Sequence, residues 1–239
     1  MPETLGLFVA AFLASTLASV TGFGGGAVLL PLMVAEFGVR DAVPIMTVGQ
    51  LVGNVSRVWF TRRQLEWPVL GWFSVGAVPL ALLGGTLFAS APLRVLIRLL
   101  GAFLVLVVVW RHIRPKPPGR LSVRSFALVG AVASFLSALL GTAGPVAAPF
   151  FLSYGLVKGA YIGTEALTAV VTHLTKLVAY RHAAVLTGWS IGIGLMLGVV
   201  MIAGSFVGTR VVDRLPERLF VRLVEAVLVL TGLWFLIRG

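Results

Sequence analysis

The feature that most constrains this chain is an apolar run that is too long for one membrane-spanning helix. No charged residue occurs between Leu5 and Ala35, and the middle of the run reads Thr-Gly-Phe-Gly-Gly-Gly from Thr21 to Gly26. A straight helix of this length would measure roughly 46 Å, whereas the hydrocarbon core of a bilayer is about 30 Å thick. Because glycines permit a tight backbone reversal, we expect two helical pieces that meet at the cluster.

The composition places the chain among membrane proteins. Of its 239 residues, 59% are hydrophobic and 11% are charged, against about 25% charged residues in soluble domains. Several segments of roughly 18 or more residues carry few or no charges, which predicts an all-α, polytopic helical membrane protein. The first four residues contain no basic group, so we expect no cleaved signal peptide. The chain has no cysteine, which excludes disulfides and thiolate metal sites, and we predict neither a metal nor a cofactor.

The net charge of +11 has two readings, nucleic-acid binding and membrane orientation. Most lysines and arginines lie between apolar segments, where such residues set orientation and meet anionic lipid headgroups. The densest cluster is interspersed with proline and glycine, which is typical of an exposed loop; it consists of Arg111, Arg114, Lys116, Arg120 and Arg124. No aromatic residues are interleaved to stack on bases. We therefore predict membrane lipid, and no nucleic acid, as a partner.

The chain repeats itself. A second glycine break, from Gly141 to Pro145, follows the first by about 118 residues, and residues 92–110 align without gaps on 216–234. We predict a single membrane transport domain, 1–239, in which a basic linker loop, 113–120, joins a first repeat, 1–112, to a second, 121–239. Each repeat would be a glycine-broken segment followed by three spans. The predicted spans are 42–62, 68–89 and 93–111, then 160–180, 188–209 and 217–237.

The distribution of lysine and arginine predicts how the repeats are oriented. If each broken segment crossed the membrane, the basic residues would divide almost evenly between its two sides. If each is instead a re-entrant hairpin, most of them collect on one side, as the positive-inside rule requires. Each repeat then crosses an odd number of times, so the two are inverted, an architecture that is common in secondary transporters. Both termini would lie on the outer side of the cytoplasmic (inner) membrane.

The glycine breaks are candidate anion sites. A helix that restarts near Ala27 presents unpaired N–H groups and the positive end of its dipole, and Pro145 suits the first turn of the corresponding helix. Two such starts meeting near the midplane would bind an anion. The predicted residues are Gly24, Gly25, Gly26 and Gly144. The alternative is that small residues only permit close helix packing, as the Gly-x-x-x-Gly spacings at Gly194–Gly198 and Gly204–Gly208 suggest.

The helix after each break carries most of the intramembrane polarity. Gln50, Asn54 and Arg57 share one helical face, and four threonines from Thr164 to Thr175 share another, with polar neighbours beside them. Polar groups at this depth usually face a bundle interior or a cavity. We predict that side chains from both helices bind the substrate, namely Gln50, Asn54, Thr172, His173 and Lys176. Arg57 is a further anion contact.

Other roles remain open for four of the charged or titratable residues. Arg57 and Lys176 lie within about five residues of their predicted helix ends, so each could snorkel to the interface instead. His173 could be a packed hydrogen-bonding residue. Glu165 is predicted as a group for proton coupling, although Lys176 or another cation could neutralise it.

The same residues carry a resemblance to a known family. The first half, with its glycine cluster, Pro31, Phe37-Gly38-Val39, Ala42 and Gly84-Gly85, resembles the TauE/SafE family of membrane permeases. The second half is similar through Gly141, Gly144, Pro149, Ala160, Gly163-Thr164 and Gly204. The resemblance implies transport of sulfur-containing anions, including sulfite, thiosulfate and organosulfonates, across the inner membrane. Gly144-Pro145-Val146 and Glu165 depart from the usual family pattern.

We therefore predict a secondary transporter that moves a small sulfur-containing anion by alternating access. The alternatives are a passive channel for such anions and a permease for a different small anion. An enzyme would need a nucleophile–base pair or a metal cluster, and we predict no catalytic residue. A cation permease would want several intramembrane carboxylates, which are missing from the sequence. A homodimer is left open.

Overall fold

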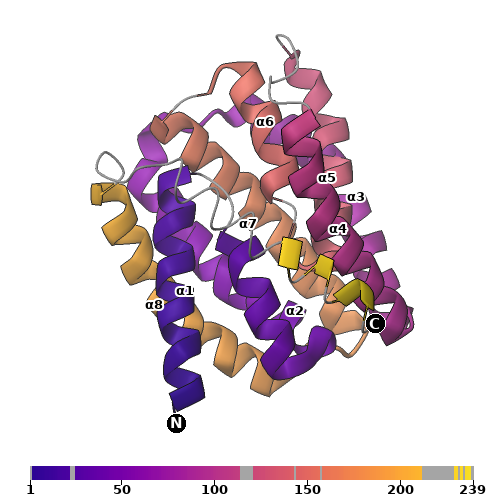
Figure 1. Ribbon diagram of the computed structural model, residues 1–239. Helices are drawn as coiled ribbons and strands as arrows, with labels where there is room; N and C mark the ends of the chain where they lie inside the picture. Colours follow the sequence, from indigo (N-terminus) through magenta and orange to yellow (C-terminus); the bar gives the residue numbers. More distant parts are fainter. Residues whose placement is uncertain are drawn as a thin grey trace.

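The computed structural model describes residues 2–21, 25–113, 121–142, 144–156 and 158–211, and near the C-terminus 229, 230, 232, 233 and 235–237. Every regular element in these ranges is helical (Figure 1). The helices are α1 (Pro2–Thr21), α2 (Gly25–Thr61), α3 (Trp67–Ser90), α4 (Leu93–Ile113), α5 (Phe126–Leu140), α6 (Gly144–Tyr154), α7 (Lys158–His182) and α8 (Gly188–Val211), with short 3₁₀ turns η1 (Arg62–Gln64) and η2 (Val123–Ser125).

The predicted class, a polytopic helical membrane protein, is confirmed. Four segments in the described ranges are long and apolar enough to cross a membrane: Trp67–Ser90, Leu93–Trp110, Val123–Leu140 and Gly188–Gly208. The predicted spans 68–89, 93–111 and 188–209 coincide with α3, α4 and α8, while 42–62 and 160–180 fall on α2 and α7. Most of the predicted span 217–237 and nearly all of the basic loop lie outside the described residues.

The second apolar run is broken where its glycines predicted, whereas residues 22–24 of the first predicted break lie outside the described residues. Helix α1 ends at Thr21 and α2 begins at Gly25; α5 ends at Leu140 and α6 begins at Gly144. With 11 residues, α6 is about 16 Å long, too short to cross a bilayer core of about 30 Å. The re-entrant course of the segments and the inverted orientation of the halves remain predictions.

An interruption lies inside α2, between the first apolar run, which ends at Ala35, and the predicted span 42–62. Gly38 has φ 71° and ψ 164°, which separates a short stretch, 25–37, from a long one, 39–61. A side chain at this backbone conformation would be strained. The second half has a corresponding feature, since α6 is followed by Gly155 with φ 103°. Each short helix that begins at a break therefore ends at a glycine with positive φ.

The two halves pack reciprocally. Helix α3 of the first half lies against α5 and α7 of the second, and α8 of the second half lies against α1 and α2 of the first. Figure 1 shows α1 and α8 side by side on one flank and α3 beside α5 on the other. The long stretch of α2 also packs on α7 between these flanks. The polar helices of the two repeats therefore meet in the middle of the bundle.

Glycines let the flanking helices approach closely. A Cβ atom on Gly130 of α5 would lie 2.2 Å from the carbonyl oxygen of Phe73, and one on Gly208 of α8 would lie 2.3 Å from that of Thr16. A Cβ on Gly194, Gly198 or Gly204 would likewise lie 2.5, 2.7 or 2.0 Å from its nearest neighbouring atom. The packing interpretation is therefore correct for these Gly-x-x-x-Gly spacings, since small residues are what close contacts between membrane helices require.

Candidate functional site

A cavity of about 70 Å³ lies where the two halves meet. Six helices and the α5–α6 connection line it, and the two glycine breaks and the two polar helices all contribute. The lining residues are Ala18, Gly25, Gly26, Gln50, Asn54, Arg57, Phe73, Ala133, Ser134, Ser137, Thr142, Gly144, Ala147, Phe151, Glu165, Thr168, Ala169, Thr172 and His173. Helices α4 and α8 do not reach it.

The structure brings nearly all of the predicted site residues to this one cavity. Its lining includes Gly25, Gly26, Gly144, Gln50, Asn54, Arg57, Glu165, Thr172 and His173. Lys176 lies just behind the wall, where its Nζ donates a hydrogen bond of 3.3 Å to the hydroxyl of the lining residue Ser137. Gly24 lies outside the described residues. What these residues bind remains a prediction.

The beginnings of two helices open onto the cavity. Gly25 and Gly26 start α2, and Gly144 starts α6. The first N–H groups of a helix have no partner within it, and neither first turn contains an acidic side chain. A Cβ on Gly26 would lie 2.9 Å from both amide atoms of Gln50 and 3.0 Å from the hydroxyl oxygen of Thr142. Glycine at this position therefore lets polar groups from both halves converge.

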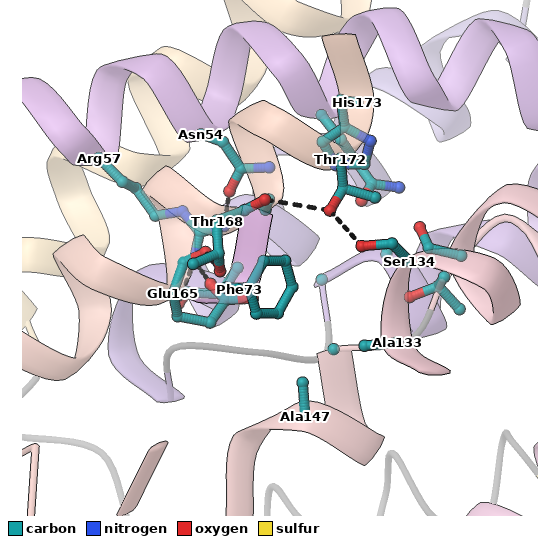
Figure 2. Close-up of a pocket in the computed structure, with 18 of the residues that line it drawn as sticks. Asn54, Arg57, Phe73, Ala133, Ser134, Ala147, Glu165, Thr168, Thr172 and His173 are labelled. Atoms are coloured by element: carbon teal, nitrogen blue, oxygen red, sulfur yellow. Dashed lines mark hydrogen bonds and ion pairs between the residues drawn. The ribbon is translucent and has the colours of Figure 1, made fainter. Parts of the chain in front are cut away.

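Arg57 is held inside the bundle by three partners. Its side chain is 8% exposed. Nη1 donates to the carbonyl oxygen of Ala18 at 3.1 Å and lies 3.5 Å from Oε2 of Glu165, while Nη2 donates to Oδ1 of Asn54. The alternative of snorkelling is wrong for Arg57, and it is also wrong for Lys176, which is fully buried. The carboxylate of Glu165 therefore pairs with a cation from the opposite half (Figure 2).

The threonines of α7 bond mainly to their own helix, and Thr172 also contacts α5. Thr168 donates to the carbonyl oxygen of Glu165 at 2.8 Å, and Thr172 donates to that of Thr168 at 3.0 Å. The hydroxyls of Thr172 and Ser134 lie 2.8 Å apart across the cavity wall (Figure 2). A hydroxyl has one proton to give. Since Thr172 uses its proton on its own helix, Ser134 is the donor of this pair.

Several buried polar atoms lack a hydrogen-bond partner within the described part of the chain. They are Nε2 of Gln50, Nδ1 of His173, Oε2 of Glu165 and the hydroxyl oxygen of Tyr161. Buried polar atoms in folded proteins are bonded in the large majority of cases. Three of these four side chains line the same cavity, so the cavity is built to receive a polar ligand or water.

The family model described as sulfite exporter TauE/SafE matches residues 7–235, nearly the whole chain. The chain belongs to the TauE/SafE family. No curated protein and no solved structure matches it. Membership confirms the resemblance that the glycine motifs indicated, and the family implies a membrane transporter of sulfite or related anions.

Sequence reasoning missed part of the lining of this TauE/SafE cavity. Ser134 and Ser137 are the only polar residues of α5, three positions apart and so on one face. In the register that aligns Asn54 with Thr172, they correspond to Thr16 and Ser19 of α1, of which Ser19 is also buried. This repeated pair was the available signal. Phe73, Ala147 and Phe151 gave none, because apolar residues in apolar helices do not reveal which face they occupy.

Basic and acidic side chains are unequal in number inside the described part of this TauE/SafE protein. Among the buried side chains of the described residues, arginine, lysine and glutamate are represented by Arg57, Lys176 and Glu165. Glu165 pairs with Arg57, and no carboxylate pairs with Lys176 in the described part of the chain. A buried amine without a carboxylate partner either gives up its proton or pairs with another anion. An anion in the adjacent cavity would supply such a partner.

Proposed function

We propose that this TauE/SafE protein is a secondary transporter that moves a small sulfur-containing anion across the cytoplasmic membrane by alternating access. The substrate class is sulfite, thiosulfate or a short organosulfonate. One observation carries the proposal: two helix beginnings and the buried side chain of Arg57 converge on one cavity between the halves, with Lys176 directly behind its wall. Helix beginnings and cations both favour anions, and membrane transporters often bind their substrates where repeats meet.

The size of the cavity agrees with a small substrate. A water molecule needs about 10–15 Å³ of such space, so 70 Å³ accommodates roughly five waters or an oxyanion of four or five heavy atoms. A polar lining that combines amides, hydroxyls and cations suits the oxygen atoms of such an anion. An organosulfonate with a long chain would require the cavity to widen.

We assign the substrate contacts as follows. The N–H groups that begin α2 and α6 at Gly25, Gly26 and Gly144 face the anion. The amide nitrogen of Gln50 and the ring nitrogen Nδ1 of His173 have no hydrogen-bond partner among the described residues. The side-chain oxygen of Asn54 accepts from Arg57, and we assign the amide N–H groups of Asn54 to the substrate. Lys176 acts through Ser137 from behind the wall. Thr172 positions α7 rather than donating to the substrate.

Alternating access would come from movement of one half against the other, with the two polar helices as the surfaces that separate. The reciprocal packing of α3 and α8 across the halves supports a pseudo-twofold arrangement. Together with the charge distribution it supports inverted repeats with both termini outside. A C-terminal reporter that is active only in the cytoplasm should therefore be silent, and an active one would contradict this orientation.

The test is uptake of radiolabelled thiosulfate by proteoliposomes under imposed gradients. A transporter accumulates the anion against its gradient and saturates, whereas a passive channel only equilibrates it. Thermal-shift measurements with sulfite, sulfate, thiosulfate, sulfoacetate and taurine would rank the substrates. If none of the five raises the melting temperature and thiosulfate does not enter, the proposed function is wrong.

A further inference from the structure

We propose that the carboxylate of Glu165 pairs with Arg57 when the site holds no substrate. The transported anion then takes the place of this carboxylate at Arg57, and Glu165 takes up a proton. This proposal rests on the proposed function and adds its coupling. The carboxyl group would release the proton again when the anion leaves. One proton would then travel with each anion in the same direction.

The geometry of the pair is that of a replaceable partner. Nη1 of Arg57 lies 3.5 Å from Oε2 of Glu165, which is longer than the 2.7–2.9 Å of a charge-assisted hydrogen bond. The guanidinium is oriented by other atoms, the carbonyl oxygen of Ala18 and Oδ1 of Asn54. Oε2 of Glu165 makes no hydrogen bond with any described residue. Removing the carboxylate would therefore leave Arg57 in place and facing the cavity.

The cavity cannot hold two anions at this cation without a compensating proton. Arg57 and Glu165 both line it, and at about 70 Å³ an entering anion would come within a few ångströms of the carboxylate. Their side chains are 8% and 9% exposed, so little water screens the repulsion between like charges. Of two anionic groups that share such a site, one is neutralised by a proton. The carboxylate is the group that can remain bound in its neutral form.

No other described cation is placed to pair with Glu165 instead of Arg57. Lys176 lies eleven positions beyond Glu165 on α7, about 16 Å along the helix axis, so it does not neutralise the carboxylate. On the same helix, Tyr161 lies one turn away and His173 about two turns away. Helix α5 presents serine and alanine to the cavity, and α6 presents glycine, alanine and phenylalanine. At the start of α3, Glu66 is engaged through its backbone N–H with the hydroxyl of Thr164, and the η1 arginines, Arg62 and Arg63, are exposed.

The pair is absent from the matched place in the repeat. In the register that aligns Asn54 with Thr172, Glu165 corresponds to Thr47 and Arg57 corresponds to Thr175. The hydroxyls of both threonines donate to carbonyl oxygens of their own helices. The two halves thus line the cavity with similar residues, but only one Arg–Glu pair is present at these matched positions. A single carboxylate would therefore take up a single proton.

The experiment counts protons taken up when the purified protein binds thiosulfate, which stays fully ionised at neutral pH. Titration calorimetry in two buffers with different ionisation heats gives this number directly. We expect close to one proton per anion, and an affinity that falls up to tenfold per pH unit wherever Glu165 is ionised in the free protein. Glu165→Gln should bind at least as tightly, with no proton uptake and no such pH dependence. Glu36→Gln, which changes an exposed carboxylate, should behave like the unchanged protein.

The wild-type proton count does not depend on any variant, so it decides the matter even if Glu165→Gln folds poorly. Glu165→Asp keeps the carboxylate and should keep the proton uptake. Thiosulfate binding without proton uptake, or undiminished uptake in Glu165→Gln, would overturn this proposal and leave the proposed function intact. If thiosulfate, sulfite and sulfoacetate all fail to bind the wild-type protein, the proposed function itself fails.

Discussion

A single methyl group at Gly26 tests whether the cavity is the substrate site. Gly26 is the second residue of α2, and an added Cβ would approach both amide atoms of Gln50 to 2.9 Å and the hydroxyl oxygen of Thr142 to 3.0 Å. These are ends of side chains, not backbone, so they can shift. At Gly25 the same change would place Cβ 2.4 Å from the carbonyl oxygen of Ala14, which would force α1 and α2 apart. Gly26 is therefore the cleaner position.

The magnitude of the effect follows from these contacts. Overpacking a filled site costs about 1–3 kcal/mol, but alanine is favoured over glycine in a helix by about 0.8–1.0 kcal/mol. The free energy of unfolding of Gly26→Ala should thus decrease by at most about 2 kcal/mol. In the cavity, the methyl takes the place of roughly one of five water-sized volumes. One methylene in a binding pocket is worth about 1–3 kcal/mol, so we expect affinity for the anion to fall about 10- to 200-fold.

Two measurements on the same preparations check this prediction: thiosulfate binding by calorimetry and thermal unfolding in detergent. Gly204→Ala is the matched control, because its Cβ would lie 2.4 Å from the carbonyl oxygen of Phe12 in α1, a residue that does not line the cavity. That variant should unfold at a lower temperature while its folded fraction binds thiosulfate normally. If Gly26→Ala binds thiosulfate as tightly as the unchanged protein, the cavity is not the site and the argument from its lining is wrong.

Two further substitutions separate binding from packing. Lys176→Met replaces a fully buried lysine with an apolar chain of similar length. We expect anion affinity to fall at least tenfold, while the free energy of unfolding stays level or rises by about 1–4 kcal/mol. A loss of both affinity and stability would contradict a role for Lys176 in anion binding. Gly130→Ala would drive Cβ to 2.2 Å from the carbonyl oxygen of Phe73, so thermal unfolding should show a loss of about 3 kcal/mol or more, whereas Gly71→Ala, with nothing within 4 Å, should change little.

The helical framework could be predicted because the membrane imposes it. Long uncharged runs must become helices whose backbone groups bond internally, and this is why the predicted spans 68–89, 93–111 and 188–209 match α3, α4 and α8 within a few residues. The breaks were predictable for a related reason, since a run longer than the bilayer core has to change course. An interruption between the first apolar run and the predicted span 42–62 was also expected, because Glu36, Arg40 and Asp41 lie between them. That the backbone turns at Gly38 was not predicted, since only its φ and ψ angles reveal this.

The membership of the site was largely predictable, but its pairings were not. Gln50, Asn54 and Arg57 share a face by spacing alone, and this spacing correctly brought them to one cavity. The partner of Glu165 depended on how the halves pack. Along its own helix the only cation deep in the membrane was Lys176, yet Arg57 from α2 is the residue that reaches it. A contact between distant segments has no local signature in a single sequence.

The departure of Glu165 from the usual family pattern acquires a physical meaning from this pairing. Without a carboxylate at this position, Arg57 and Lys176 would both lie unoffset beside the cavity, and an anion attracted by two buried cations would bind tightly and leave slowly. If the proposed exchange is right, a carboxylate that pairs with one of them weakens this attraction and makes it depend on pH. Transport requires binding that is reversible on both sides of the membrane, and under this proposal the ion pair of Arg57 and Glu165 contributes to that reversibility.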